Sequence, residues 1–489
     1  MINSKTVLST ALLAAVMAPS MSMASGYKLN EQSAAGMGTA HAGRAAIAED
    51  ASVVFYNPAA MTELDRAQIT AGFTYINADG QFTGSSVNAA QLPSSFEGYD
   101  NGGNYLGEAF IPFVYYVRPI NEKFSVGLGI FAPFGTNTDY GDNFAGAGFA
   151  DETSLTSIEI APTFAYKVND QLSIGGGIDI VYMEGLLSKS ADLIPFNPLV
   201  DPDVPTALNP VEKRGFENHF EVSGDDWGYG WNIGAYYKLS DATTLGLTYR
   251  SEIEITLEGE AEFADKSDLD FYVSSAKVLA STAFGTTFDS RTQAAEVPLT
   301  TPASATLAIT HQVTNELLLQ AGTTWTGWSS FQNFDVFATE NVAALNDPQA
   351  GLGDGYADVS DLSGLGGDYI GHIDESWTDV WALALGGTYQ LNERIALRAG
   401  YAYDQSPVDD AHRTARVPSS DRQWLTFGVG YVVDQNLSID VAAGYLFMYP
   451  MDLNEVNKNV DNTQKDAASV TGEYEIDVFG LSAQVNYKF

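Results

Sequence analysis

Most of the chain consists of segments in which apolar residues alternate with polar or small ones. In residues 227–237 the odd positions are aromatic or aliphatic, and most even positions are glycine or asparagine. Residues 394–404 and 481–489 alternate in the same way. A period of two is that of a β-strand with one apolar face. That face points to the core in a soluble sandwich and to lipid in a membrane barrel.

Short polar turns join these segments and allow the strands to be counted. Six such turns, each joining two strands, give 12 strands, and one strand before the first turn (67–78) and one after the last (475–489) bring the number to 14. The turns are Asn121-Glu122, Asn169-Asp170, Ser240-Asp241, Thr314-Asn315, Asn392-Glu393 and Asp434-Gln435-Asn436.

Long connections separate these hairpins, at roughly 79–104, 134–152, 188–224, 262–297, 332–376, 406–420 and 450–474. Short turns at one end and long loops at the other are typical of bacterial outer-membrane barrels, which have an even number of strands. We therefore predict an all-β fold, a 14-stranded antiparallel transmembrane β-barrel over residues 67–489. Phe489, with Tyr487 two residues earlier, fits the closing strand of such a barrel.

Two segments precede the barrel. Residues 1–24 contain Lys5, a largely apolar run and a small-residue end, which predict a secretory signal peptide rather than a membrane anchor. Residues 25–66 do not alternate and are rich in alanine and glycine. A barrel of this size has an open lumen unless something fills it, so we predict a small N-terminal hatch that plugs it. The alternative, a periplasmic tail, fits poorly with the apolar run 53–56.

Composition narrows the functional classes. The 489 residues include 23 Lys and Arg and 62 Asp and Glu, so the net charge is 23 − 62 = −39, and there is no cysteine. Such acidity argues against nucleic acid as a partner, because phosphate binding needs a cationic surface. The lack of cysteine excludes disulfides, thiolate metal sites and thiol nucleophiles.

An ordered series of motifs resembles one family over essentially the whole mature chain, the outer-membrane long-chain fatty acid transporters (FadL) and their aromatic-hydrocarbon relatives. The resemblance implies a 14-stranded barrel with an N-terminal hatch, a monomer, and a long-chain fatty acid or other hydrophobic small molecule as ligand. The motifs are Gly26–Glu31, Asn57-Pro58-Ala59, Trp227–Asn232, Leu247–Glu252, Trp328–Gln332, Asp404–Val408 and Asp421–Leu425.

The third strand contains a proline that a closed barrel wall does not accommodate. Proline cannot donate to a ladder and is confined to edges and bulges, so Pro133 predicts a local break, and Pro112 in the preceding strand lacks a donor as well. Pro133 either opens the wall or ends the strand at the loop. The resemblance implies the first: a kink that forms a lateral opening at Pro133, Phe134 and Gly135.

The resemblance also assigns roles in the N-terminal segment. Asn57, Pro58 and Ala59 match the family's hatch motif. The alternative interpretation of these residues is an ordinary turn fixed by proline. The family places the mature N-terminus near the ligand, which implicates Tyr27 and Leu29, although both could simply pack the plug.

A fatty acid carboxylate needs a cationic or multiple-donor partner when it is buried. Alternation directs Arg250 and Arg422 into the lumen, where each either holds the head group or pairs with acids of the wall or plug, such as Glu49, Asp50 and Glu63.

The ligand's charge stays open, because no Lys or Arg lies between Arg291 and Arg394 and the loops there are acidic. A neutral aromatic hydrocarbon or alkane is therefore the alternative substrate. Asp354, Asp358 and Asp361 do not have the spacing of an EF-hand, and we expect solvated loops, bridged through divalent ions to lipopolysaccharide, with no metal site.

Two other functional classes fit less well. A hydrolase lacks support, since no Gly-x-Ser-x-Gly elbow stands at a strand end and the histidines (His41, His219, His311, His372, His412) have no recognisable catalytic spacing. A general porin is disfavoured by residues 25–66. With no phosphate-binding loop and no cofactor expected, we predict a passive transporter in the outer membrane rather than an enzyme.

Overall fold

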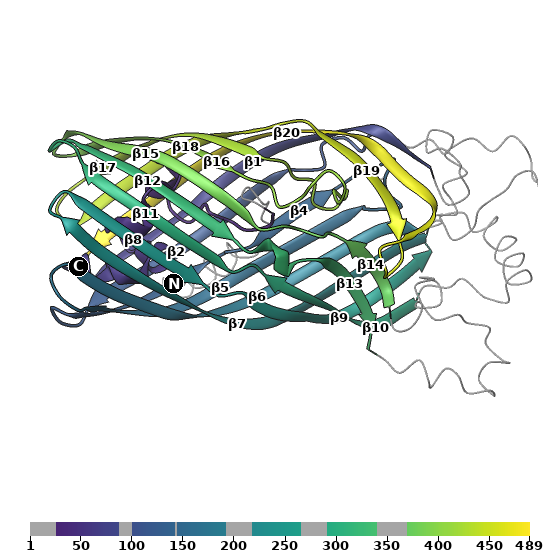
Figure 1. The fold of residues 1–489 in the computed structure, drawn as a ribbon, viewed down its shortest axis with the longest axis horizontal. Coiled ribbons are helices and arrows are strands. Elements are labelled where there is room, and N and C mark those ends of the chain that lie inside the picture. Colours follow the sequence, from purple (N-terminus) through teal and green to yellow (C-terminus); the bar gives the residue numbers. More distant parts are fainter. Residues whose placement is uncertain (1–25, 88–99, 142–143, 192–217, 266–290, 340–368) are drawn as a thin grey trace, which may run out of the picture.

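The computed structural model describes residues 26–87, 100–141, 144–191, 218–265, 291–339 and 369–489. The predicted signal peptide and Asp354, Asp358 and Asp361 lie outside these residues. The described chain forms one closed antiparallel barrel, with β1 paired to β20 (Figure 1). It contains 20 strand elements, but six wall strands are each broken into two consecutive elements, so the wall has 20 − 6 = 14 strands, as predicted.

Eight wall strands are continuous, and the other six consist of two elements each. The continuous strands are β1 (Gln68–Val87), β2 (Glu108–Pro119), β5 (Glu152–Lys167), β6 (Leu172–Ala191), β7 (Asn218–Ser240), β16 (Ile395–Asp404), β17 (Arg422–Val432) and β20 (Gln464–Lys488). The broken strands are β3 (Phe124–Phe131) with β4 (Gly135–Asp139), β8 (Thr243–Arg250) with β9 (Ile253–Asp265), β10 (Arg291–Thr301) with β11 (Ser304–Gln312), β12 (Leu317–Thr326) with β13 (Asn333–Ala338), β14 (Tyr369–Asp374) with β15 (Val380–Asn392), and β18 (Leu437–Met448) with β19 (Met451–Lys458).

All six predicted turns connect strands in the structure, but the long connections were predicted too long. β1 continues to Val87 instead of ending near residue 78, and β20 begins at Gln464 instead of near residue 475. β4, β13, β14 and β19 lie within ranges that were predicted to be loops.

The predicted strands were too short because the apolar residues move to the opposite face of the strand outside the membrane. On β7, Trp227, Tyr229 and Trp231 point outward and are exposed, as lipid-facing residues should be. Further along the same strand, Phe220 and Val222 are buried inside, while outward positions such as Ser223 and Asp225 are polar. Beyond the apolar band the wall faces water, so its apolar face turns inward while the strand continues.

The N-terminal segment, residues 26–66, lies inside the barrel at the end with the short turns (Figure 1). It touches strands around the whole wall, from β5–β8 to β17, β18 and β20. Its elements are α2 (Ala34–Met37), η1 (Arg44–Ala46), α3 (Val53–Tyr56) and η2 (Pro58–Glu63), and η4 (Trp328–Ser330) lies between β12 and β13. No described helix is long and apolar enough to cross a membrane.

Candidate functional site

The wall ladder is interrupted at the third strand, where the sequence placed Pro133. β2 and β3 pair up to Phe113 and Phe131, and the ladder then stops, with Pro112 directly past its last pair. Pro133 is buried between β3 and β4. The strand resumes at Gly135, so Pro133 interrupts it within the wall and does not end it at a loop. β4 pairs with β5 on one side, and no described pair joins it to β2 on the other.

Residues 27–29 of the N-terminal segment occupy this second edge of β4. The Leu29 amide donates to the Pro133 carbonyl at 2.9 Å, and the Gly135 amide donates to the Tyr27 carbonyl at 2.8 Å. Lys28 forms an antiparallel bridge with Phe134 between these two bonds. The interrupted wall is therefore completed, at the kink, by the plug instead of by the neighbouring strand.

Residues of this N-terminal segment border three cavities. A central cavity of about 160 Å³ is bordered by Lys28, Leu29, Pro133, Phe134, Arg250 and Asp404. Tyr27 borders an apolar cavity of about 20 Å³. Gly26 and Arg422 border a third of about 50 Å³. Three consecutive residues, Gly26, Tyr27 and Lys28, therefore border three different cavities.

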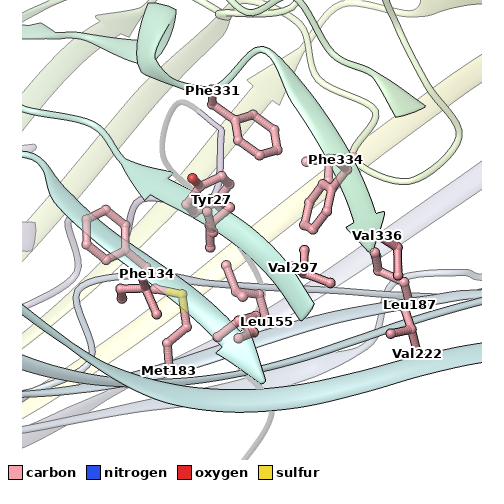
Figure 2. Packing of buried hydrophobic residues seen from close by; sticks show 14 of the residues in the cluster. Tyr27, Phe134, Leu155, Met183, Leu187, Val222, Val297, Phe331, Phe334 and Val336 are labelled. Carbon is pink, nitrogen blue, oxygen red and sulfur yellow. The ribbon is translucent and has the colours of Figure 1, made fainter. Parts of the chain in front are cut away.

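Tyr27 lies in an apolar cluster deep in the lumen (Figure 2). Its ring meets Trp328, Phe331 and Phe134 edge-on, with centroids 4.6, 5.5 and 6.0 Å away. Leu29 is fully buried and borders the central cavity. Both residues therefore pack inside the barrel and also border cavities, and their contact with a ligand stays a prediction.

Asn57-Pro58-Ala59 lies where the plug meets β6 and β7. The Asn57 side-chain Nδ2 donates to the Ala45 carbonyl at 2.7 Å and to the Ala235 carbonyl of β7 at 3.0 Å. The Asn57 side-chain oxygen caps η2 by accepting from the backbone N–H of Ala59 at 3.1 Å. A Cβ on Gly234 would lie 2.1 Å from that oxygen. Only a residue without a Cβ lets the plug approach the wall this closely.

Arg250 faces the central cavity, but its charge is already balanced. Its Nη1 lies 2.6 Å from Glu159 and 2.8 Å from Asp179, two fully buried acids of β5 and β6. The sequence analysis named Glu49, Asp50 and Glu63 as possible partners of Arg250 and Arg422. Those acids instead pair with other cations: Glu49 with Arg44 and Arg398, Asp50 with Arg44, and Glu63 with Lys238.

Arg422 and Lys28 lack such pairing. Arg422 is buried, and its Nη2 donates to Ser419 Oγ at 2.8 Å. Lys28 is partly exposed to the central cavity. Within the described residues, neither has a carboxylate within 4.0 Å. Sequence reasoning missed Lys28, although it lies between Tyr27 and Leu29 in an extended segment, where a period of two directs it to the opposite face.

A closed barrel with an apolar outer band, whose lumen contains residues 26–66 and an apolar cavity, is typical of an outer-membrane transporter of hydrophobic compounds. The chain belongs to the family described as "Outer membrane protein transport protein (OMPP1/FadL/TodX)", which matches residues 15–489. This confirms the family resemblance and the outer-membrane location. The family consists of transporters rather than enzymes.

Individual relatives cover nearly the whole chain. The long-chain fatty acid transport protein of Escherichia coli O6:H1 is 30% identical over 449 residues, 91% of this chain and 92% of that protein. Outer membrane protein P1 of Haemophilus influenzae is 29% identical over 99% of both chains. A Pseudomonas aeruginosa FadL homologue is 27% identical with a TM-score of 0.77, covering 95% of this chain and 100% of that one. The toluene transporter TbuX of Ralstonia pickettii, 18% identical with a TM-score of 0.62, covers 94% of this chain and 99% of its own and shares the fold.

Proposed function

We propose that the protein carries long-chain fatty acids across the outer membrane by passive diffusion. The ligand enters from the extracellular side, binds in the central cavity and leaves sideways into the membrane between β2 and β4. The observation that carries this proposal is the edge of β4, which residues 27–29 cover in place of a wall strand. Movement of these residues would uncover a route from cavity to lipid.

In this scheme residues 25–66 are the hatch, and Asn57, Pro58 and Ala59 are its gate, where the hatch meets the wall and shifts on ligand binding. Tyr27 and Leu29 contact the acyl chain, since both border cavities beside the kink. Pro112, Pro133, Phe134 and Gly135 frame the lateral opening. Of the two arginines, Arg422, which borders the cavity of about 50 Å³, is the one that can contact a head group, because the two acids on Arg250 favour a structural role for that residue.

Fatty acid as substrate is supported by the relatives named long-chain fatty acid transport protein. A neutral aromatic hydrocarbon or alkane remains the alternative, because the family description also includes TodX and the loops are acidic. We further propose that residues 1–24 are removed on export, that the barrel functions as a monomer, and that its acidic loops meet lipopolysaccharide through divalent ions.

The test is uptake of labelled oleate by a bacterial host that lacks its own outer-membrane fatty acid transporter. The chain is compared with a version in which strand-forming residues replace Pro133 to Gly135. Chain-dependent uptake that falls in the straightened version supports the proposal. A folded, heat-modifiable barrel that gives no oleate uptake would exclude fatty acid and point to toluene or alkanes.

A further inference from the structure

The cations that border the central cavity differ in whether their charge is balanced. Arg250 forms ion pairs with Glu159 and Asp179. Arg44 forms ion pairs with Glu49 at 3.4 Å and with Asp50 at 3.8 Å. Burial, together with Arg44, lowers the pKa of His41 to about 3, so this side chain is neutral at physiological pH. Among the described cations and histidines that border this cavity, Lys28 is the one whose charge has no close acid.

Lys28 is held in place by its backbone. The bonds of its two neighbours to Pro133 and Gly135 fix residues 27–29 as an extended strand against the kink. Lys28 is partly exposed and borders the central cavity, whereas Tyr27 is buried and borders a different cavity. A cation therefore stands at the point where the wall ladder is interrupted.

Charges of both signs surround Lys28. Those that act on it are the charges of Asp404, which borders the same cavity, and of Arg250. Arg422 lies within the electrostatic reach of Asp404, Glu31 and Asp421. Burial raises the pKa of Glu31 to about 7, so this carboxyl carries less negative charge at neutral pH than an exposed glutamate does.

Desolvation also affects the lysine itself. Burial, reinforced by the positive charge of Arg250, lowers the pKa of Lys28 to about 8. An anion bound beside the ammonium would relieve both effects, because it replaces lost hydration and offsets the neighbouring guanidinium.

We propose that the Lys28 ammonium binds the carboxylate of the transported lipid at the kink, and that this contact selects monoanionic long-chain carboxylates over neutral hydrocarbons. The inference rests on the proposed function and names the group that sets its substrate class. The acyl chain would lie against the apolar side of the cavity, which includes Leu29, Phe55, Phe134 and Trp424.

The test measures uptake of two probes with the same chain, labelled oleate and labelled oleyl alcohol, by the transporter-deficient host. The variants are Lys28→Gln, Lys28→Arg and the control Lys123→Gln, which changes an exposed lysine in the turn between β2 and β3. Heat-modifiable migration confirms that each variant is folded. We expect Lys28→Gln to lower oleate uptake about tenfold, the size of one charge-assisted hydrogen bond. Oleyl alcohol uptake should be unchanged, and Lys28→Arg should retain oleate uptake.

Three other outcomes of this experiment would contradict the proposals. Wild-type levels of oleate uptake in Lys28→Gln would overturn the inference while leaving fatty acid transport intact. An equal loss of oleate and oleyl alcohol would also overturn it, because the lysine would then only position the hatch. Failure of the wild-type chain to take up oleate would overturn the proposed function and this inference together.

Discussion

Lys28 of the plug and Phe134 of the barrel wall form an antiparallel bridge across the kink. The backbone bonds lie on either side of this pair, from Leu29 to Pro133 and from Gly135 to Tyr27, so the two residues are a non-hydrogen-bonded pair with closely spaced Cα atoms. Two such bonds contribute about 2 kcal/mol together. A ligand that binds in the adjacent cavity can compete with an attachment of this size, which is what a hatch requires.

The first prediction concerns the contact between plug and wall at Gly234. A Cβ there would lie 2.1 Å from the Asn57 side-chain oxygen, and that side chain is held by bonds to Ala45, Ala235 and Ala59. Gly234→Ala should therefore destabilise the barrel by about 1–3 kcal/mol, as overpacking does. The measurement is the temperature at which the folded band disappears on a gel.

Gly322→Ala is the matched control for this substitution. It is another wall glycine that faces the plug, but its Cβ would meet its nearest neighbour, the Gly43 nitrogen, at 3.4 Å, an ordinary contact. Equal melting temperatures for the two variants would show that the plug does not press on Gly234.

The second prediction separates a structural role of Arg250 from a head-group role. Arg250→Met leaves Glu159 and Asp179 buried without a cation, which should cost about 3–5 kcal/mol of stability. The additional changes Glu159→Gln and Asp179→Asn remove those charges and should restore much of the loss. Urea unfolding of the refolded barrel measures both. An Arg250→Met barrel with wild-type stability and no oleate uptake would assign the head group to Arg250.

The third prediction is a pH dependence of ligand binding. Lys28 and Glu31 belong to the plug, and their pKa values are shifted by burial to about 8 and about 7. As the pH rises from 6 to 9, Glu31 gains negative charge and Lys28 then loses its positive charge, so both changes weaken the binding of an anion. Arg250 and Arg422 stay charged throughout, since guanidinium groups do not deprotonate in this range.

A long-chain alkyl sulfonate is the suitable probe, because it stays ionised over the whole range and its own titration does not interfere. Its affinity, followed by tryptophan fluorescence of the purified barrel, should fall with rising pH. In Lys28→Arg only the part of the fall due to Glu31 should remain. An affinity that is constant from pH 6 to 9 in the wild-type barrel would contradict this account.

Much of the wall could be predicted from the sequence, for a physical reason. A strand between lipid and lumen must alternate, and turns at one end need Asn, Asp or Ser, so strand number and turn positions follow from local residues. The extent of the strands does not, because Phe220 and Val222 keep the period of two while the apolar face changes sides.

The breaks in the wall are also only partly visible in the sequence. Pro133 interrupts its strand, whereas Pro162 lies within the continuous strand β5 and Pro298 lies inside the element β10 without breaking it. A proline therefore marks a candidate break, and tertiary contacts decide whether the strand is split. At Pro133 the decisive contact comes from residues 27–29, more than 100 residues earlier in the chain.

The contacts within the candidate site could likewise be predicted only in part from the sequence. Arg250 could be placed in the lumen by alternation, but its partner Glu159 lies 91 residues away on a strand that is not its neighbour. Such pairs depend on the register of the barrel and on the length of side chains that cross it. The sequence analysis missed Lys28 because it considered head-group cations only on the strands and not in the N-terminal segment.

The most direct test of the lateral route uses the bridge itself. The chain has no cysteine, and a non-hydrogen-bonded antiparallel pair has the Cα spacing that a disulfide needs. Lys28→Cys with Phe134→Cys would therefore allow the plug to be locked to β4 and released again in the same molecule. Because Lys28 is lost, labelled oleyl alcohol is the probe, and each single variant under oxidising conditions is the control.

We predict that the oxidised double variant takes up almost no oleyl alcohol, that reduction restores uptake to the level of the single variants, and that oxidation leaves those single variants unaffected. Equal uptake by the oxidised and reduced double variant, with the disulfide shown to be fully formed, would contradict the account, because the ligand would then cross the barrel without uncovering the edge of β4.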